Sequence, residues 1–237
     1  MTTELFRDDA YLKECTAKVT AVNDRGGIVL DQTVFYPTGG GQPGDSGVLV
    51  LEDGAEIPIA TTVKGDGPDE IVHVPAEGAA LPAAGAPVVA RIDWDRRYRH
   101  MRMHSAMHIL CSVVQCGVTG GQVGAEKSRL DFDIGEATLD KERIQAEITR
   151  VIDEDRGMAA RWVTDEEMDT NPDLVRTMSV APPRGSGRVR LMEIDGVDLQ
   201  ACGGTHVKST GEIGAIRVGK IENKGKRNRR VNIHLEG

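Results

Sequence analysis

The stretch YRHMRMHSAMHILCSVVQ, residues 98–115, marks the point at which the sequence changes from strand patterning to helix patterning. Its apolar residues recur at intervals of three and four and form one stripe along a helix. These residues are Met103, Met107, Leu110 and Val114. Gly117 and the pair Gly120-Gly121 follow, and glycine is typical of helix ends. We therefore expect a helix that begins near Tyr98 and ends before Gly117.

The residues before this helix predict a small all-β domain. Six runs rich in β-branched residues lie between residues 15 and 93 at roughly ten-residue spacing, which is typical of a sandwich or a small barrel. The runs are CTAKVTAV (15–22), GGIVLDQTVF (26–35), SGVLVL (46–51), EIPIATTV (56–63), EIVHV (70–74) and APVVARI (86–92). Residues 76–87 are small and turn-forming, and we interpret them as a loop before the last strand.

The residues after the helix predict an α+β domain, because helical and strand runs are mixed there. The expected helix is TLDKERIQAEITRVIDED (138–155). The expected strands are SRLDFDI (128–134), MAARWVT (158–164), GRVRLMEI (187–194), GAIRVGKI (214–221) and RVNIHL (230–235). We place the domain boundary near residue 93, which gives domains of residues 1–93 and 94–237.

The composition predicts a globular chain without a membrane segment. Hydrophobic residues make up 39% of its 237 residues, and no apolar run approaches the ~20 residues that a membrane-spanning helix needs. The N-terminus, MTTELFRDDAYLKEC, is acidic and polar where a signal peptide would be basic and then apolar. We expect a cytoplasmic protein with no membrane partner, in which four widely spaced cysteines stay free of disulfides.

The charge pattern leaves room for nucleic acid on one face of the molecule. A formal net charge of −8 argues against a protein that coats nucleic acid evenly. The basic residues nevertheless gather in two clusters, which are Arg96, Arg97, Arg99 and Arg102, and then Lys220, Lys224, Lys226, Arg227, Arg229 and Arg230. Such patches on an acidic protein favour RNA binding, and a solvated charged surface is the alternative.

Two pairs of metal-binding residue types predict a zinc site. His104 and His108 are four residues apart, so their imidazoles lie on one face of a helix and can bind one ion. CGGTH (202–206) adds the thiolate of Cys202 and the imidazole of His206 across a flexible glycine pair. Two close pairs that lie far apart in sequence indicate a site built by a folded enzyme, since a short zinc finger carries its ligands close together.

Two other residues compete for a place in this site. His100 lies four residues before His104, but a row of three histidines at this spacing drifts round the helix and does not share one ion well. Cys111 lies three residues after His108, and both rivals rank below the CGGTH pair. Ser105 occupies the position at which a zinc protease of the HExxH type carries its glutamate base, so a protease is not expected.

A glycine-rich stretch, FYPTGGGQPGDSG (35–47), contains a formal GxGxxG pattern. Pro43 and the strand-like residues after it contradict a dinucleotide-binding turn, which must open a helix. Asp45 stands where a phosphate-binding P-loop requires lysine. A tight hairpin connection and a close backbone approach to a ligand stay open, and the excess of glycine over what a turn requires favours the second.

FYPTGGGQPGDSG (35–47), HMRMHSAMH (100–108) and CGGTH (202–206), in this order, resemble the alanyl-tRNA editing proteins of the AlaX family. These are similar to the editing domain of alanyl-tRNA synthetase and, more distantly, of threonyl-tRNA synthetase. The resemblance implies a small N-terminal β-barrel followed by an α+β editing domain of the threonyl/alanyl-tRNA synthetase second-additional-domain type. It also implies that one zinc ion is held by His104, His108, Cys202 and His206.

The same resemblance implies an activity and a partner. Family members remove serine or glycine from the tRNA for alanine by hydrolysing the ester bond, so mischarged tRNA(Ala) is the expected partner. No ATP-binding or aminoacylation segment is found in the sequence, so the chain is expected to edit and not to charge tRNA. The sequence leaves open the preference between serine and glycine, the recognition of the tRNA and the oligomeric state.

Further site residues follow less directly. The family carries a functional polar residue after the first zinc helix, and Gln122 is the candidate here. We expect Gln122 and Thr205 to be the catalytic residues, and either could recognise the substrate hydroxyl that alanine lacks. We expect substrate contacts from the glycine-rich loop and from the arginines that lie along the zinc helix. These residues are Thr38, Gly39, Gly40, Gly41, Gln42, Asp45, Arg99 and Arg102.

Four protein ligands describe a closed zinc site, whereas a catalytic zinc keeps one position open. Either one ligand binds loosely and the zinc activates a water, or the zinc anchors the substrate while a separately held water attacks. Amides of the glycine-rich loop would then stabilise the oxyanion. The competing hypotheses are a zinc-stabilised RNA-binding module without catalysis and a zinc hydrolase of small metabolites.

Overall fold

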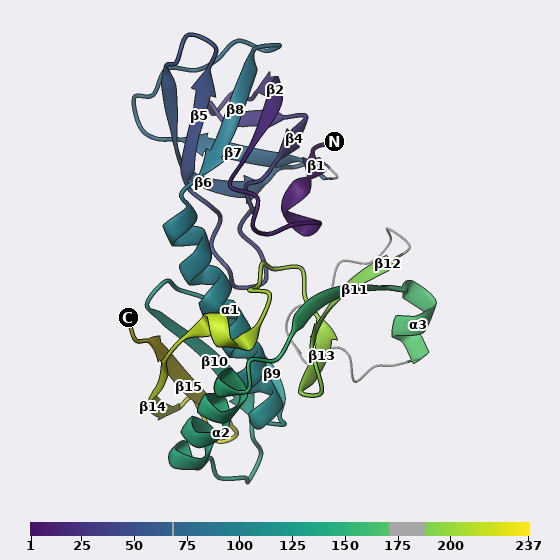
Figure 1. Cartoon of the computed structure of the whole chain (residues 1–237), viewed down its shortest axis with the longest axis vertical. Helices are drawn as coiled ribbons and strands as arrows, with labels where there is room; N and C mark the ends of the chain where they lie inside the picture. The colour runs from purple at the N-terminus through teal and green to yellow at the C-terminus, as the bar shows by residue number, and fades with distance from the viewer. Residues whose placement is uncertain (68, 171–187) are drawn as a thin grey trace. The chain divides into compact units, whose positions relative to one another are not determined.

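The computed structural model describes residues 1–67, 69–170 and 188–237 of the chain (Figure 1). It divides into two compact units, Met1–Tyr98 and Arg99–Gly237. The division falls within helix α1 (Trp94–Val113), and the predicted domain boundary near residue 93 lies at the beginning of the same helix. Within the described residues, no helix is both long and apolar enough to cross a membrane.

The first unit is built round a closed six-stranded barrel with the strand order β2-β3-β7-β6-β5-β8 (Figure 1). Its strands are β2 (Glu14–Val22), β3 (Ile28–Leu30), β5 (Gly47–Leu51), β6 (Glu56–Lys64), β7 (Ile71–Pro75) and β8 (Pro87–Ile92). Buried and exposed residues alternate along β6, so that Ile57 and Ile59 point into the core beside Leu30, Leu49 and Ala90. The predicted N-terminal barrel is confirmed.

The run GGIVLDQTVF, expected as one strand, is interrupted at Asp31. The carboxylate of Asp31 accepts hydrogen bonds from the backbone N–H groups of Lys18 and Gln32, at 2.8 and 2.9 Å. A side chain that binds nearby backbone groups competes with the strand ladder. The chain therefore leaves the barrel after β3, and β4 (Gln32–Thr33) pairs in parallel with β1 (Thr3–Glu4), which precedes the 3-10 turn η1 (Leu5–Arg7).

The second unit contains an antiparallel four-stranded sheet with the order β14-β15-β10-β9. Its strands are β9 (Gly117–Gln122), β10 (Lys127–Asp133), β14 (Ile216–Asn223) and β15 (Asn228–Leu235). Helix α2 (Lys141–Asp153) lies beside β14, because Gln145 donates to the carbonyl of Ile216 and accepts from the N–H of Val218. Asp140 caps this helix by accepting from two backbone N–H groups of its first turn.

A three-stranded sheet of order β11-β12-β13 completes the described part of this unit. Its strands are β11 (Met158–Thr164), β12 (Arg188–Ile194) and β13 (Asp198–Ala201), with the short helix α3 (Asp165–Thr170) after β11 and the 3-10 turn η3 (Thr210–Ile213) before β14. Gly187, the first residue of one expected strand, lies outside the described residues. The predicted α+β class is confirmed.

The expected start of helix α1 was wrong. The helix begins at Trp94 and not near Tyr98, because Asp93 accepts hydrogen bonds from Arg96 N through its carboxylate and from Arg97 N through its carbonyl. The helix ends at Val113, before Gly117 as expected, and the glycine-containing stretch Gly117–Gln122 then forms strand β9, which was not predicted. A side chain at Gly121 would come within 2.9 Å of Leu130 on β10, so glycine at this position leaves room for the Leu130 side chain.

Candidate metal centre

Helix α1 presents the first two candidate ligands from a buried position. His104 and His108 are 7% and 5% exposed, and their ring centroids are 5.5 Å apart, one helical turn along the same face. Buried polar side chains require partners, because an unpaired one loses its hydration without compensation. Cys202, on a loop 98 positions later in the chain, lies beside the ring of His104.

That loop begins directly after β13 and contributes Cys202 and His206. The Cys202 Sγ atom lies 3.6 Å from His104 Nε2 and 3.2 Å from His206 Nε2. The ring of His206 lies 4.4 Å from that of His104 and 4.6 Å from that of His108, centroid to centroid. One donor atom from each of the four residues lies within 4.8 Å of the other three. We call these four residues the metal cluster.

The donor set of the metal cluster fits zinc. One thiolate and three imidazoles are ligand types that zinc accepts in a tetrahedral arrangement. For Zn–N of about 2.05 Å and Zn–S of about 2.3 Å, a tetrahedral site separates sulfur from nitrogen by about 3.5 Å. The two measured separations from Cys202 Sγ, 3.2 and 3.6 Å, lie close to this value.

Arg190 on β12 fixes the backbone of the Cys202–His206 loop. Its Nη1 donates to the carbonyl oxygens of Cys202 and Gly204 at 2.9 and 3.0 Å, and its own carbonyl accepts from the N–H of Cys202. The N–H of Gly204 lies 3.4 Å from Cys202 Sγ, where it stabilises a thiolate. The loop that carries two candidate ligands is thus held by a neighbouring strand.

The electrostatics of the metal cluster favour a thiolate. Burial opposes it, but the three surrounding imidazoles hold the pKa of Cys202 well below its usual value. Burial lowers the pKa of His206 well below its usual value, more strongly than the thiolate raises it. Burial also lowers the pKa of His108, but Cys202 and Asp198 outweigh it and raise that pKa to about 9. The thiolate is the form of cysteine that binds metals.

Two polar residues outside the metal cluster contact its histidines, and the sequence did not reveal them. Asp198 Oδ2 lies 3.3 Å from His108 Nδ1 and also accepts from Gln200 Nε2 at 2.6 Å. Ser105 Oγ lies 3.2 Å from His206 Nδ1 and accepts from the N–H of Val207. The one signal in the sequence was proximity, since Ser105 follows a candidate ligand directly.

The two rival ligands do not belong to the group that the structure brings together. His100 and Cys111 are both buried, with 2% and 5% of their surface exposed. Within the described residues, however, the cluster of potential metal ligands consists of His104, His108, Cys202 and His206. This is the set that the resemblance implies.

The two residues predicted to act on the substrate lie in different settings. Thr205 is 1% exposed and stands between ligands of the loop. Gln122 is exposed at the end of β9, where its Oε1 lies 3.4 Å from Arg129 Nε. Gln122 pairs with Arg129 across the sheet, whereas the adjacent Gly121 faces Met107 of α1. The catalytic role of both residues stays a prediction.

The arginines of α1 also differ from one another. Arg99 is exposed, whereas Arg102 is half-buried and donates from Nε to the carbonyl of Ile213 at 2.8 Å. A side chain at Gly214 would come within 2.6 Å of Arg102 Nη2, so the guanidinium lies against this turn. Substrate contacts by Arg99 and Arg102 stay predictions, and Arg99 is the more accessible of the two.

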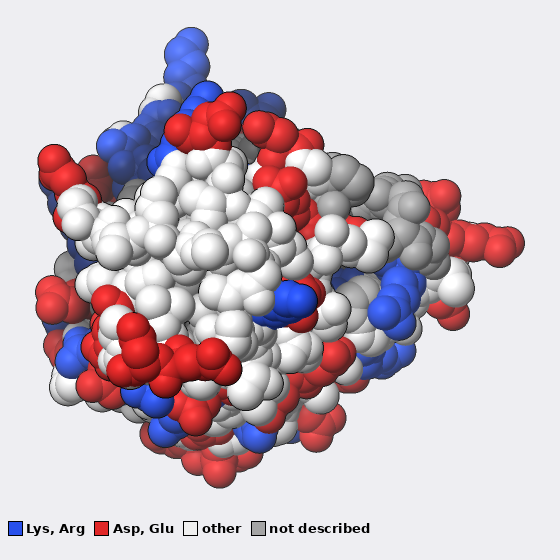
Figure 2. All heavy atoms as spheres, turned by 90° about the horizontal axis from the view of Figure 1, so that it is seen from above, with Lys and Arg blue, Asp and Glu red and all other residues white. Residues whose placement is uncertain are grey.

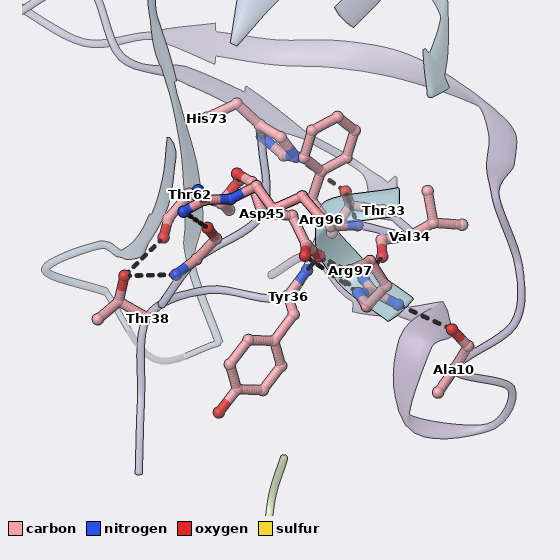
Figure 3. A network of polar contacts seen from close by, with 12 residues as sticks. Ala10, Thr33, Val34, Tyr36, Thr38, Asp45, Thr62, His73, Arg96 and Arg97 are labelled. Atoms are coloured by element: carbon pink, nitrogen blue, oxygen red, sulfur yellow. Dashed lines mark hydrogen bonds and ion pairs between the residues drawn. The ribbon is translucent and has the colours of Figure 1, made fainter. Parts of the chain in front are cut away.

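The predicted glycine-rich loop belongs to the first unit (Figure 3). Gly39 and Gln42 exchange two backbone hydrogen bonds, and the exposed tip between them has positive φ at Gly40 and Gly41, which favours glycine. Thr38 closes the base of the loop, because its hydroxyl accepts from the N–H of Gly44 at 2.9 Å. The loop is a compact turn, and its contact with a ligand stays a prediction.

Asp45 anchors this loop through a buried ion pair with Arg97 (Figure 3). Both side chains are almost completely buried, and Arg97 Nε lies 3.0 and 2.9 Å from the two carboxylate oxygens. Arg97 also donates to the carbonyls of Ala10 and Val34, and Asp45 accepts from the N–H of Tyr36. In the structure the Asp45 carboxylate is therefore engaged within its own unit.

The second basic cluster is partly neutralised by acidic neighbours. Arg230 and Arg129 both pair with Asp131, and Arg227 pairs with Asp133. Figure 2, which views the molecule from above, shows a broad area of uncharged side chains with both acidic and basic groups at its margins. That face does not carry the continuous basic surface that a phosphate backbone would favour.

Comparison with known proteins matches both units. A family model described as the threonyl and alanyl tRNA synthetase second additional domain matches residues 189–232, and one described as class II (A) tRNA synthetases matches residues 4–96. The alanine–tRNA ligase of Pyrobaculum neutrophilum is 37% identical over 93% of this chain, which corresponds to 25% of that enzyme. This chain is thus similar to one portion of a much longer synthetase.

Shorter proteins match it from end to end. The alanyl-tRNA editing protein AlaX-M of Methanosarcina acetivorans is 42% identical, and the match covers 98% of each chain. AlaX-M of Saccharolobus solfataricus is 37% identical, again over 98% of each chain. This chain belongs to the AlaX family of alanyl-tRNA editing proteins, and its metal cluster and glycine-rich loop are the residues that first indicated the family.

Proposed function

We propose that this protein is a trans-editing hydrolase that removes serine from mischarged tRNA(Ala) at a centre that holds one zinc ion. The observation that carries the proposal is the metal cluster, in which four donor atoms lie within 4.8 Å of one another. Relatives named alanyl-tRNA editing proteins, similar over almost their full length, support the choice of substrate. We also propose a cytoplasmic location.

His104, His108, Cys202 and His206 would hold the zinc. Bound there, zinc would supply a Lewis acid that polarises or anchors the aminoacyl group. The rigid helix α1 fixes two of these side chains, and Arg190 fixes the loop that carries the other two. This division places the ligands on elements whose positions do not depend on the substrate.

Selectivity would come from recognition of the hydroxyl that serine has and alanine lacks. A pocket that charges alanine cannot strongly reject a substrate with one added hydroxyl, so a second site must demand that group. Thr205 and Gln122 are the proposed hydroxyl-recognising residues. Thr205 is the more shielded of the two from water, because it is buried beside His206. A buried hydroxyl favours serine over alanine strongly, because it would be left without a hydrogen-bond partner when the substrate lacks a hydroxyl.

The test is a comparison of two charged forms of the same tRNA. The purified protein is incubated with seryl-tRNA(Ala) and with alanyl-tRNA(Ala), before and after removal of metal by a chelator. We expect release of serine to be much faster than release of alanine and to stop without metal. Re-addition of zinc to the chelated protein is expected to restore the rate.

The competing hypotheses give different results in this experiment. A zinc-stabilised RNA-binding module would bind the tRNA, release no amino acid and unfold when metal is removed. A hydrolase of small metabolites would cleave a seryl ester that lacks the tRNA body as fast as the charged tRNA. Either result would replace trans-editing as the function.

A further inference from the structure

Among the described residues, two polar side chains contact histidines of the metal cluster without belonging to it. Asp198 on β13 and Ser105 on α1 each face the Nδ1 atom of one histidine, His108 and His206 respectively. Asp198 is 6% and Ser105 0% exposed, so water does not readily replace either contact. Both residues lie where they can act on a ligand without binding the metal.

The geometry of the histidines fixes what these contacts can do. His206 directs Nε2 at Cys202 Sγ, at 3.2 Å, and therefore carries its hydrogen-bonded proton on Nδ1 when Nε2 is a ligand. Ser105 Oγ can accept that proton at 3.2 Å. In the same way, a proton on His108 Nδ1 can be donated to the Asp198 carboxylate, which leaves Nε2 unprotonated.

We propose that Asp198 and Ser105 are positioning residues of the metal centre, which select the Nδ1–H tautomer of His108 and His206 and hold each Nε2 atom toward a dication. The inference rests on the proposed zinc centre but not on the proposed reaction. Partners of this kind orient ligating histidines and raise their basicity. Neither residue is a ligand in this assignment.

Asp198 contributes more than Ser105, because its acceptor is charged. A hydrogen bond to a carboxylate is roughly twice as strong as one between neutral groups. The carboxylate also adds a negative charge to the surroundings of the metal cluster, which favours a bound cation. The guanidinium of Arg190 donates hydrogen bonds from Nη1 to the carbonyl oxygens of Cys202 and Gly204.

Gln200 holds Asp198 in place. Its Nε2 donates to the same Oδ2 atom that faces His108, at 2.6 Å, and both residues project from β13 two positions apart. Residues two apart on a strand lie on the same face of the sheet. The chain of contacts therefore runs from Gln200 through Asp198 to His108.

The experiment measures the affinity of the full-length chain for zinc by competition with a chromogenic chelator. Asp198→Ala removes both charge and acceptor, and we expect an affinity about 100-fold weaker; Ser105→Ala is expected to lose about tenfold. Asp198→Asn keeps an acceptor of the same shape without the charge and is expected to lie between Asp198→Ala and the parent chain. Ser112→Ala is the matched control, since this serine lies on the same helix and bonds only to the carbonyl of Ile109 in the contacts described.

A second readout separates positioning from general weakening of the fold. The visible absorption of bound Co²⁺ reports on the geometry of its ligands, and we expect it to change in the Asp198 and Ser105 variants but not in Ser112→Ala. Affinities within twofold of the parent chain, with an unchanged Co²⁺ spectrum, would overturn the inference and leave the proposed function intact. A parent chain that binds no zinc would overturn the proposed centre itself.

Discussion

The metal cluster and the glycine-rich loop are the two most conspicuous motifs of the sequence, and the structure uses their polar groups in opposite ways. In the metal cluster, four donor atoms from two distant segments face one another across less than 5 Å. In the glycine-rich loop, the carboxylate of Asp45 is already bonded to Arg97 and to Tyr36 N. The first motif brings four potential metal ligands to one point, and in the second the polar groups already have partners within the protein.

This difference shows how a binding motif can be distinguished from a structural one. Four electron-pair donors packed together repel one another unless a cation or shared protons lie among them, so their convergence on one point favours a binding function. A buried anion that meets a guanidinium needs no further partner, so its burial indicates a structural function. The predictions below test this separation, beginning with the largest expected effect.

Substitution Cys202→Ala is expected to have the largest effect. Without the thiolate, the metal cluster keeps only neutral donors, and we expect deacylation of seryl-tRNA(Ala) to fall to the rate without protein. Release of labelled serine measures this. The matched control is Cys111→Ala, which removes a buried thiol from α1 outside the metal cluster and is expected to keep most of the activity. Full activity of Cys202→Ala would reject the metal role.

Substitution Asp45→Ala tests the scaffold side of the comparison. It leaves the buried guanidinium of Arg97 without its counter-charge, and we expect the free energy of unfolding of the first unit to fall by about 3–5 kcal/mol. Trp94 belongs to this unit, so its fluorescence during urea denaturation reports the change in a Trp162→Phe background. Zinc affinity of the folded protein is expected to stay the same.

The double substitution Asp45→Ala with Arg97→Met supplies the control. It removes both charges together, and an ion pair replaced by apolar side chains loses far less stability than a pair that is broken. We expect the double variant to be more stable than Asp45→Ala. If the two variants unfold at the same urea concentration, the ion pair is not what anchors the loop.

Lowering the pH is expected to destabilise the barrel through His73. This ring is completely buried; Thr33 Oγ1 lies 2.8 Å from its Nε2, and the carbonyl of Ile28 lies 3.1 Å from its Nδ1. Because burial disfavours the charged ring, the pKa of His73 falls from 6.5 to about 4. The unfolded chain therefore binds the proton first, and folding loses stability as the pH falls from 6.5 to 4.

The size of this loss follows from the shift. A pKa shift of this size corresponds to about 3 kcal/mol of folding free energy, and this stabilisation is complete above pH 6.5 and lost below pH 4. Urea denaturation of the first unit, followed by Trp94 fluorescence across this range, measures it. His73→Gln cannot titrate, so its stability is expected to vary less with pH; an equal slope in both proteins would assign the effect to other groups.

Substitution Gln122→Ala is expected to have the smallest effect on stability. The side chain is exposed and makes one long contact with Arg129, so the free energy of unfolding should change by less than about 0.5 kcal/mol. If Gln122 recognises the substrate hydroxyl, the preference for seryl- over alanyl-tRNA falls by about fivefold, the worth of one hydrogen bond. Arg129→Ala is the control, since it removes the same contact and keeps Gln122.

The sequence predicted those features that depend on local spacing. The barrel strands follow from runs such as EIPIATTV, whose alternation is the same whatever lies opposite. The four-residue spacing of His104 and His108 places both rings on one helix face before any tertiary contact forms. The residues of the metal cluster were therefore accessible to sequence reasoning, and the structure places their donor atoms together.

Features that depend on tertiary neighbours were missed. Strand β9 was not predicted, because its glycines were interpreted only as the end of the preceding helix; a side chain at Gly121 would come within 2.9 Å of Leu130 on the neighbouring strand. Asp198 has no local signal at all, since its role depends on a histidine 90 positions earlier. Ser105 was used only to exclude a protease, although it contacts His206 from the opposite end of the unit's sequence.

The distance in sequence between the two halves of the metal cluster also determines when it can form in a living cell. His104 leaves the ribosome 98 residues before Cys202, an interval of about 5 to 20 s at ordinary rates of translation. Throughout that time the helix can offer an incoming ion two imidazoles but no thiolate. The growing polypeptide therefore holds all four candidate ligands only after His206 has been synthesised.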